Sequence, residues 1–261
     1  MISYVRLDPT GNLTCLVTKM PPEADEAAVT RTLMRECEQV AYLEPPTRPG
    51  SRARIRLMGG EFCGNAALAS ACLLAREDGI LPGEERTVPL EVSGADGVLA
   101  CTARRTENGF EGTAPMPKIQ RVWLEQEGIY TLTAVRMEGI LHLILENEKP
   151  LKKDAAETLL RRAAETQPDE AVGLLQWDRH RSQMIPLVYV RGSGTLVWET
   201  GCGSGSAAIG AREAMRREDG VHELEIWQPG GMIRVTAQVK NGWAEQVSIT
   251  GRVKIGPEQE L

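Results

Sequence analysis

Two cysteines in repeated segments are the residues best suited to chemistry. The segment EFCGNAALASA (61–71) returns as TGCGSGSAAIGA (200–211), with Cys63 and Cys202 139 residues apart. In both copies a Cys-Gly turn leads into an alanine-rich stretch that favours helix. We therefore expect each cysteine at a helix N-terminus, where the macrodipole and the unpaired N–H groups lower the pKa of a thiol and favour the thiolate.

A thiolate and a thiol can together invert a carbon that carries an acidic proton. One sulfur removes the proton from one face and the other returns a proton to the opposite face. Because the two groups are alike, they would share one proton and titrate as a coupled pair. Backbone amides in the same turns can hold a carboxylate and stabilise the carbanion; these belong to Gly64, Asn65, Gly203, Ser204 and Gly205. The residues thus predict racemisation or epimerisation of an amino acid.

Two other functions compete with this interpretation. A papain-like hydrolase would use one cysteine with a dedicated histidine, which leaves the repetition unexplained. A small-molecule binding module would need the two cysteines to be remnants, although both lie in full motifs. The remaining cysteines are interpreted as small buried hydrophobic residues; they are Cys15, Cys37, Cys72 and Cys101.

Composition narrows the class of protein. The 261 residues are 42% hydrophobic and 25% charged, as in a globular protein, and the formal net charge of −6 argues against nucleic-acid binding. No apolar run reaches the 18 or so residues of a membrane span, and MISYVRLDPTGN turns polar too early for a signal peptide, which predicts a cytoplasmic protein. Without a CxxC pair, a histidine cluster or a lysine motif for pyridoxal phosphate, we expect neither metal nor cofactor.

The fold class expected is α+β, with two pseudo-symmetric mixed α/β lobes, each a curved sheet around a buried central helix. After each Cys-Gly helix the pattern of strand, glycine turn and strand recurs, at 89–103 and 223–239. The proline-rich PMPKIQ (115–120) places a boundary near 117, which gives lobes 1–117 and 118–261. Helices are expected at 23–38, 66–76, 153–165 and 206–217. Further strands are expected at 2–7, 13–18, 39–43, 54–57, 140–145, 172–176, 187–189 and 195–198.

At these motifs the chain resembles the diaminopimelate epimerase superfamily, whose two pseudo-symmetric lobes carry Cys-Gly-Asn and Cys-Gly-Ser/Thr-Gly. Three further segments look like landmarks of that superfamily, in the same order: DPTGN (8–12), CEQVAYLEPP (37–46) and LHLIL (141–145). The resemblance implies that Cys63 and Cys202 are the acid/base pair, and it suggests a homodimer. It also implies substrate contacts by Asn12, Gln39, Gly64, Asn65, Glu199, Gly203 and Ser204.

Departures from the superfamily pattern bear on the substrate. Thr200 stands where diaminopimelate epimerases have an arginine. The asparagines that read the distal head of diaminopimelate fall at Met58 or Gly59, Gly139 or Ile140, and Val172 or Gly173. Such side chains would leave that second charged head buried and unpaired.

A closer resemblance is to the histidine racemases of opine-metallophore biosynthesis, carried by GGEFCGNA, WETGCGSG and QPGG. It implies histidine as the substrate and a glutamate, Glu38 or Glu44, that reads the imidazole. Diaminopimelate and other polar amino acids remain as alternative substrates.

Overall fold

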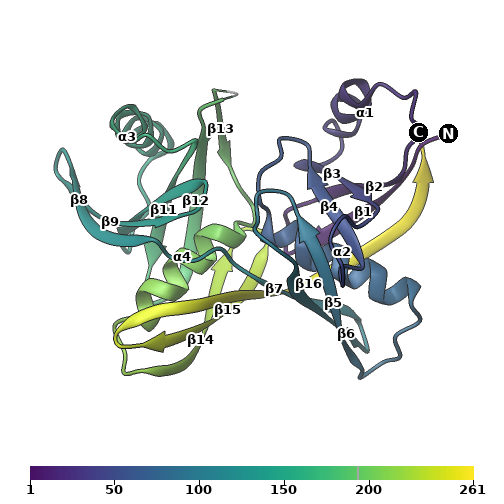
Figure 1. The fold of residues 1–261 in the computed structure, drawn as a ribbon. Helices are drawn as coiled ribbons and strands as arrows, with labels where there is room; N and C mark the ends of the chain where they lie inside the picture. Colours follow the sequence, from purple (N-terminus) through teal and green to yellow (C-terminus); the bar gives the residue numbers. More distant parts are fainter. Residues whose placement is uncertain (193) are drawn as a thin grey trace. The chain divides into compact units, whose positions relative to one another are not determined.

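Strands outweigh helices in this mixed α/β chain, as the computed structural model shows for residues 1–192 and 194–261 (Figure 1). Two units are distinguished by their internal packing. The first unit comprises Met1–Pro115 and Thr250–Leu261, and the second unit comprises Met116–Ile249. The last strand, β16 (Trp243–Glu260), contributes to both units. A single division at residue 117 does not give these two units, because residues 250–261 belong to the first unit. The lobes 1–117 and 118–261 remain a prediction from the sequence.

The first unit is an eight-stranded barrel. Its strands follow the order β1-β2-β3-β4-β5-β6-β7-β16, and β16 pairs with β1 to close the ring. The pairing of β1 with β16 is antiparallel and runs from Ser3 opposite Glu260 to Pro9 opposite Val253. The elements before β16 are β1 (Ser3–Pro9), β2 (Thr14–Lys19), α1 (Glu26–Leu33), β3 (Gln39–Glu44), β4 (Ala53–Leu57), α2 (Gly64–Glu77), β5 (Glu85–Val92), β6 (Leu99–Thr106) and β7 (Gly109–Pro115).

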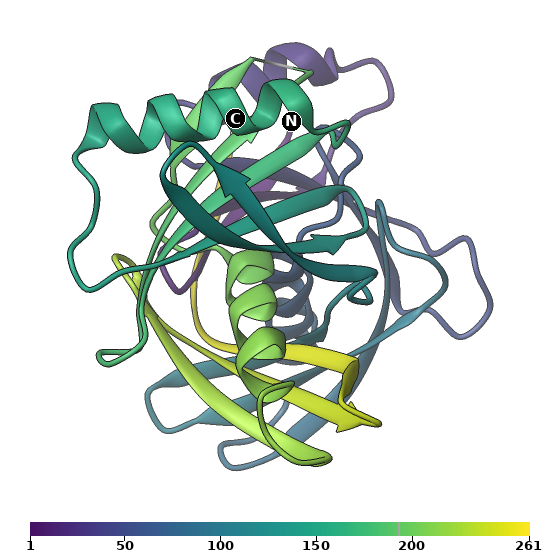
Figure 2. The ribbon, with the colours of Figure 1, turned by 90° about the vertical axis from the view of Figure 1, so that its left-hand side faces the viewer.

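The second unit places its strands in the order β8-β9-β10-β11-β12-β14-β15-β16, with β13 added beside β12. Figure 2 shows α4 lying along β14 and β15, which it contacts. The elements are β8 (Arg121–Glu127), β9 (Tyr130–Met137), β10 (Ile140–Glu146), α3 (Lys153–Thr166), β11 (Ala171–Asp178), β12 (Gln183–Val190), β13 (Thr195–Trp198), α4 (Gly203–Ala214), β14 (Gly220–Gln228) and β15 (Gly231–Lys240).

Small residues let the two alanine-rich helices approach their strands closely. Gly64–Ala75 of α2 are all buried, and α2 contacts β1 and β4 to β7. A Cβ on Gly112 of β7 would lie 2.6 Å from the carbonyl oxygen of Leu68, so only glycine permits that approach. In the second unit a Cβ on Gly210 of α4 would lie 2.4 Å from Val235 Cγ1. Both Cys-Gly helices therefore pack closely against strands of their own unit.

Most expected elements lie close to the predicted positions, with one clear exception in the first unit. The helix predicted at 23–38 is only Glu26–Leu33. Asp25 begins α1 by accepting a hydrogen bond from the N–H of Ala28 at 3.1 Å. Beyond α1 the chain pairs with β2 instead, since the N–H groups of residues 38 and 39 both donate to Leu13. No helix in the described residues is long and apolar enough to span a membrane.

Candidate active site

Cys63 is the N-cap of α2. Its backbone is extended (φ −136°, ψ 110°), and its Sγ accepts a hydrogen bond from the N–H of Ala66 at 3.4 Å. Gln39, the first residue of β3, brings its Nε2 to 3.3 Å from the same sulfur. Two N–H groups thus converge on Sγ, an arrangement that stabilises negative charge on sulfur.

A network of amides holds Gln39 beside Cys63. Gln39 Nε2 lies 2.8 Å from Asn12 Oδ1 and 2.7 Å from Thr14 Oγ1. Asn65 Nδ2 donates to the same Asn12 oxygen at 3.3 Å. The structure therefore brings together, within the first unit, four residues that the sequence nominated, Asn12, Gln39, Cys63 and Asn65, with Gly64 in the connecting turn.

The two glutamates considered for reading the substrate side chain differ in their surroundings. Glu38 Oε2 accepts a hydrogen bond from Asn12 Nδ2 at 2.9 Å, which places it in the amide network. Glu44 instead pairs with Arg56 at 2.6 Å and with Arg54 at 3.5 Å. Only Glu38 joins the residues around Cys63 through these contacts.

Cys202 is the N-cap of α4 and repeats the geometry of Cys63. Its backbone is extended (φ −113°, ψ 106°), and its Sγ accepts from the N–H of Gly205 at 3.3 Å. Gln228 fixes this turn, since its Oε1 accepts from the Cys202 N–H at 2.6 Å and its Nε2 donates to Ser206 Oγ at 2.9 Å. The Ser206 hydroxyl in turn donates to the Cys202 carbonyl at 2.8 Å.

The prediction that the helix N-terminus favours a thiolate is wrong for Cys202. Complete burial, and then the negative charge of Glu199 and its hydrogen bond to the thiol, raise the pKa of Cys202 well above its usual range. Hydrogen bonds from Ser204 and the Gly205 N–H act in the opposite direction but are weaker. Cys202 is therefore a protonated thiol in the structure described, suited to donate a proton.

His142 is a buried neighbour of this thiol to which the sequence assigned no role. Its Nε2 lies 3.0 Å from Ser204 Oγ, which lies 3.6 Å from Cys202 Sγ. Burial lowers the pKa of His142 to about 3, so the ring is neutral. A Cβ on Gly173 would lie 2.5 Å from His142 Nδ1, so this glycine makes room for the ring. In the sequence, His142 was visible only as the one histidine of the apolar segment LHLIL (141–145). A single histidine in such a buried strand is hard to distinguish from an ordinary core residue.

We expect His142→Gln to weaken the acid sensitivity of folding. A folded-state pKa of about 3 against 6.5 means that, between these values, the unfolded chain binds a proton that the folded chain excludes. The stability associated with neutral His142 is thus present above pH 6.5 and is lost as the pH falls towards 3, by about 1.4 kcal/mol per pH unit. Urea titrations at pH 6 and pH 5 should show a free energy of unfolding that falls less in the variant. Equal falls in both proteins would contradict this account.

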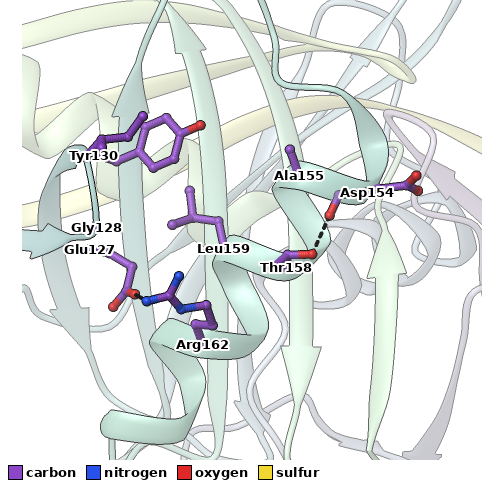
Figure 3. Close-up of a pocket in the computed structure, with 9 residues that line it drawn as sticks. Glu127, Gly128, Tyr130, Asp154, Ala155, Thr158, Leu159 and Arg162 are labelled. Atoms are coloured by element: carbon purple, nitrogen blue, oxygen red, sulfur yellow. Dashed lines mark hydrogen bonds and ion pairs between the residues drawn. The ribbon is translucent and has the colours of Figure 1, made fainter.

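A hollow of about 460 Å³ in the second unit lies away from these residues. It is formed by the β8–β9 turn and α3, where Glu127 and Arg162 form an ion pair at 3.4 Å (Figure 3). None of the predicted site residues lines it. In the part of the chain that the structure describes, no group of three or more His, Cys, Asp or Glu side chains is placed to hold a metal ion.

The predicted residues therefore form two sets, one in each unit. The second set consists of Cys202 with Gly203 and Ser204 in the first turn of α4, and Glu199 beside the thiol. Sequence reasoning did not assign a role to Thr14 or Gln228. Gln228 belongs to the QPGG segment that carried part of the resemblance, so its motif was visible although its hydrogen bonds were not.

Comparison with known proteins gives one family match over nearly the whole chain. Residues 1–260 match the family described as histidine racemase CntK N-terminal domain. A histidine racemase of Staphylococcus aureus is 28% identical over 97% of this chain and 94% of its own length. A histidine racemase of Fusobacterium nucleatum is 28% identical over 100% and 96%. Among solved structures, a predicted epimerase from Pseudomonas aeruginosa has the same fold, with a TM-score of 0.73 at 19% identity over 100% of this chain and 99% of that one.

Proposed function

The chain belongs to the histidine racemase CntK N-terminal domain family, and from this premise we propose that it racemises histidine without a cofactor, through Cys63 and Cys202. The observation that carries the proposal is the pair of matching N-caps, each with a cysteine Sγ at the first turn of a buried helix. In this proposal the two sulfurs serve opposite faces of the substrate α-carbon.

Cys63 is proposed as the base that takes the α-proton. The N–H of Ala66 and the amide of Gln39 both approach its sulfur and favour the thiolate form. As the Cα–H bond breaks, its proton passes to Cys63 Sγ and the electron pair moves into the substrate carboxylate. The backbone N–H groups in the first turns of α2 and α4 are proposed as the donors that stabilise this charge, because no carbonyl within a helix can accept from its first turn.

Cys202 is proposed as the acid that completes the inversion. Its raised pKa keeps the proton on sulfur until a carbanion forms nearby. The thiol then transfers that proton to the opposite face of the carbon, and the reverse reaction exchanges the two roles. Ser204, held by His142, positions a hydroxyl beside the sulfur that can stabilise the thiolate left behind.

Glu38 is proposed as the group that reads the imidazole. A carboxylate accepts the ring N–H of histidine, and the contact with Asn12 orients it within the same network as Cys63. Glu44 is less suited, since its carboxylate already serves two arginines.

We expect Glu38→Gln to raise the KM for L-histidine about tenfold while kcat changes little, because a hydrogen bond to a charged group contributes about 1.5 kcal/mol. Glutamine retains an oxygen for Asn12, so the network should persist. The matched control is Glu44→Gln, which loses only partly exposed ion pairs and should keep the parent KM. A larger effect of Glu44→Gln than of Glu38→Gln would assign the reading role to Glu44.

The experiment that tests the function is deuterium incorporation at Cα. Individual L-amino acids, with histidine included, are incubated with the protein in D₂O, and exchange and loss of optical activity are followed by NMR and chiral chromatography. For histidine we expect both deuterium exchange at Cα and loss of optical activity. The rates should be the same before and after dialysis against EDTA or treatment with hydroxylamine. If no amino acid exchanges, a binding module is the better interpretation. If EDTA abolishes exchange and a divalent ion restores it, the two-thiol reaction is wrong.

A further inference from the structure

Each Cys-Gly turn is tied to its own unit at the carbonyl two residues before the cysteine. In the first unit this is the carbonyl of Glu61, which accepts a hydrogen bond from Ser93 Oγ at 2.8 Å. In the second unit it is the carbonyl of Thr200, which accepts a hydrogen bond from the N–H of Gly230 at 2.7 Å. Both donors lie where the strand after the Cys-Gly helix ends, since Ser93 follows β5 and Gly230 follows β14. The same anchoring therefore occurs twice, with different donors.

In the first unit, Ser93 bridges the two ends of the segment that leads from β4 towards α2. Its Oγ accepts from the N–H of Leu57, the last residue of β4, at 2.9 Å, while it donates to Glu61. Gly94 lets the same turn pack directly on this segment, because a Cβ there would lie 2.4 Å from the backbone nitrogen of Phe62. One hydroxyl thus holds the segment at both ends.

The position of this segment matters for Cys63. Helix α2 is buried from Gly64 to Ala75, which fixes the helix within the barrel. Residues 58–61, in contrast, are exposed and include two consecutive glycines, Gly59 and Gly60. Cys63 joins the fixed helix to this exposed segment. The direction of its thiol therefore depends on where the segment is held.

In the second unit, Gln228 at the end of β14 holds the cysteine itself. A backbone N–H can only donate, so the oxygen of Gln228 faces Cys202 and its NH₂ group faces Ser206. Ser206 completes a closed ring by donating to the carbonyl of Cys202. All three residues are buried, so water cannot readily replace these contacts. Together with the bond from Gly230 to Thr200, the end of β14 holds the turn at two points.

From these contacts we propose that Ser93 and Gln228 are positioning residues, Ser93 for the thiol of Cys63 and Gln228 for that of Cys202. This role rests on the proposed racemase reaction, in which both thiols must be aimed at one carbon. A misplacement of about 1 Å can lower the rate of a reaction about a hundredfold. Loss of either side chain should therefore slow the proton transfers of its own cysteine and leave those of the other cysteine unchanged.

The two losses should have opposite effects on isotope sensitivity. One enantiomer of histidine gives its α-proton to Cys63 and receives one from Cys202, and the other enantiomer follows the reverse order. Slow transfer at Cys202 makes proton removal rate-limiting for the enantiomer that Cys202 deprotonates, which raises the α-deuterium isotope effect on kcat/KM. For the other enantiomer, proton removal becomes reversible before the slow step, which lowers that isotope effect. Slow transfer at Cys63 reverses this pattern.

The test is the α-deuterium isotope effect on kcat/KM, measured for L- and D-histidine with Ser93→Ala and Gln228→Leu. Each variant should lower kcat/KM at least about fivefold, and the two should shift the isotope effects of the two enantiomers in opposite directions. Ser93→Thr keeps the hydroxyl and should restore the parent values. Thr87→Ala, which removes an exposed hydroxyl from β5, is the control and should change neither quantity. Ser206→Ala opens the same ring and replaces Gln228→Leu if that variant does not fold. Lower activity with unchanged isotope effects, or the same shift in both variants, would overturn the proposal.

Hydrogen exchange tests the anchoring without requiring activity. By NMR, the backbone amides of residues 57–62 should exchange faster in Ser93→Ala, and those of residues 200–202 faster in Gln228→Leu, while amides in the interior of α2 and α4 keep the parent rates. Unchanged exchange in both segments would overturn the proposal. If the unmutated protein does not racemise histidine, the proposed function is refuted and the kinetic role is refuted with it, whereas faster exchange would still show that the two turns are anchored as described.

Discussion

Cys63→Ser and Cys202→Ser should each lower histidine racemisation by at least about a thousandfold, since general acid–base catalysis contributes about 10²–10⁴-fold and a serine hydroxyl is a far weaker acid than a thiol. Inversion requires proton transfer on both faces of Cα, so neither cysteine can replace the other. The measurement is the initial rate of D-histidine formation from L-histidine, with circular dichroism to verify folding.

Cys101→Ala is the matched control for these variants. Cys101 is a fully buried cysteine of the first unit, on β6, and has no part in the proposed reaction. Its replacement should lower stability slightly while turnover is retained. If either serine variant kept more than a tenth of the parent turnover, a reaction with two essential thiols could not be maintained.

L-Histidine should be converted with a kcat/KM at least about a thousandfold above that of LL-diaminopimelate, because burying a second ammonium and carboxylate without partners costs several kcal/mol. The structure adds a physical reason to the sequence argument. Gly173 cannot become an asparagine that reads a distal head while His142 occupies the adjacent space, and Val172 is a core residue.

Both substrates should be compared with one batch of enzyme, under conditions in which D-histidine and meso-diaminopimelate are quantified separately. No third reference compound is needed, because the comparison is between two amino acids with the same reacting centre. Faster conversion of diaminopimelate would mean that Thr200 does not mark the loss of the distal-head site.

The two Cys-Gly turns could be predicted from sequence because their determinants are local. A Cys-Gly turn before an alanine-rich stretch specifies both the helix and the residue at its N-cap, and the repeat provides the same information twice. The alternation of strands such as β4 and β6 also follows from nearby residues. The amide network of Gln39 could be placed only through family resemblance, since Asn12 and Gln39 are far from Cys63 in sequence.

What the sequence did not reveal depends on tertiary context. The pKa of Cys202 is decided by burial and by Glu199, which outweigh the helix N-terminus. The end of α1 is decided by competition from β2 for the backbone of residues 38 and 39. The β8–β9 hairpin was missed because its polar sequence EQEGIYT lacks a continuous apolar pattern, although Trp123 and Tyr130 pack against the core of the second unit.

The ring of strands in the first unit has a consequence for the order of events during synthesis. Its closing pair joins Ser3–Pro9 to residues 253–260, which the ribosome adds only after the whole second unit has been made. Until then β1 and β7 remain unpaired edges, which are sites for incorrect association between chains. The strand order of the second unit includes no comparable pairing between its first strand, β8, and its last strand, β16. Closure of the first unit is therefore expected to be a late step, completed only when residues 253–260 pair with Ser3–Pro9.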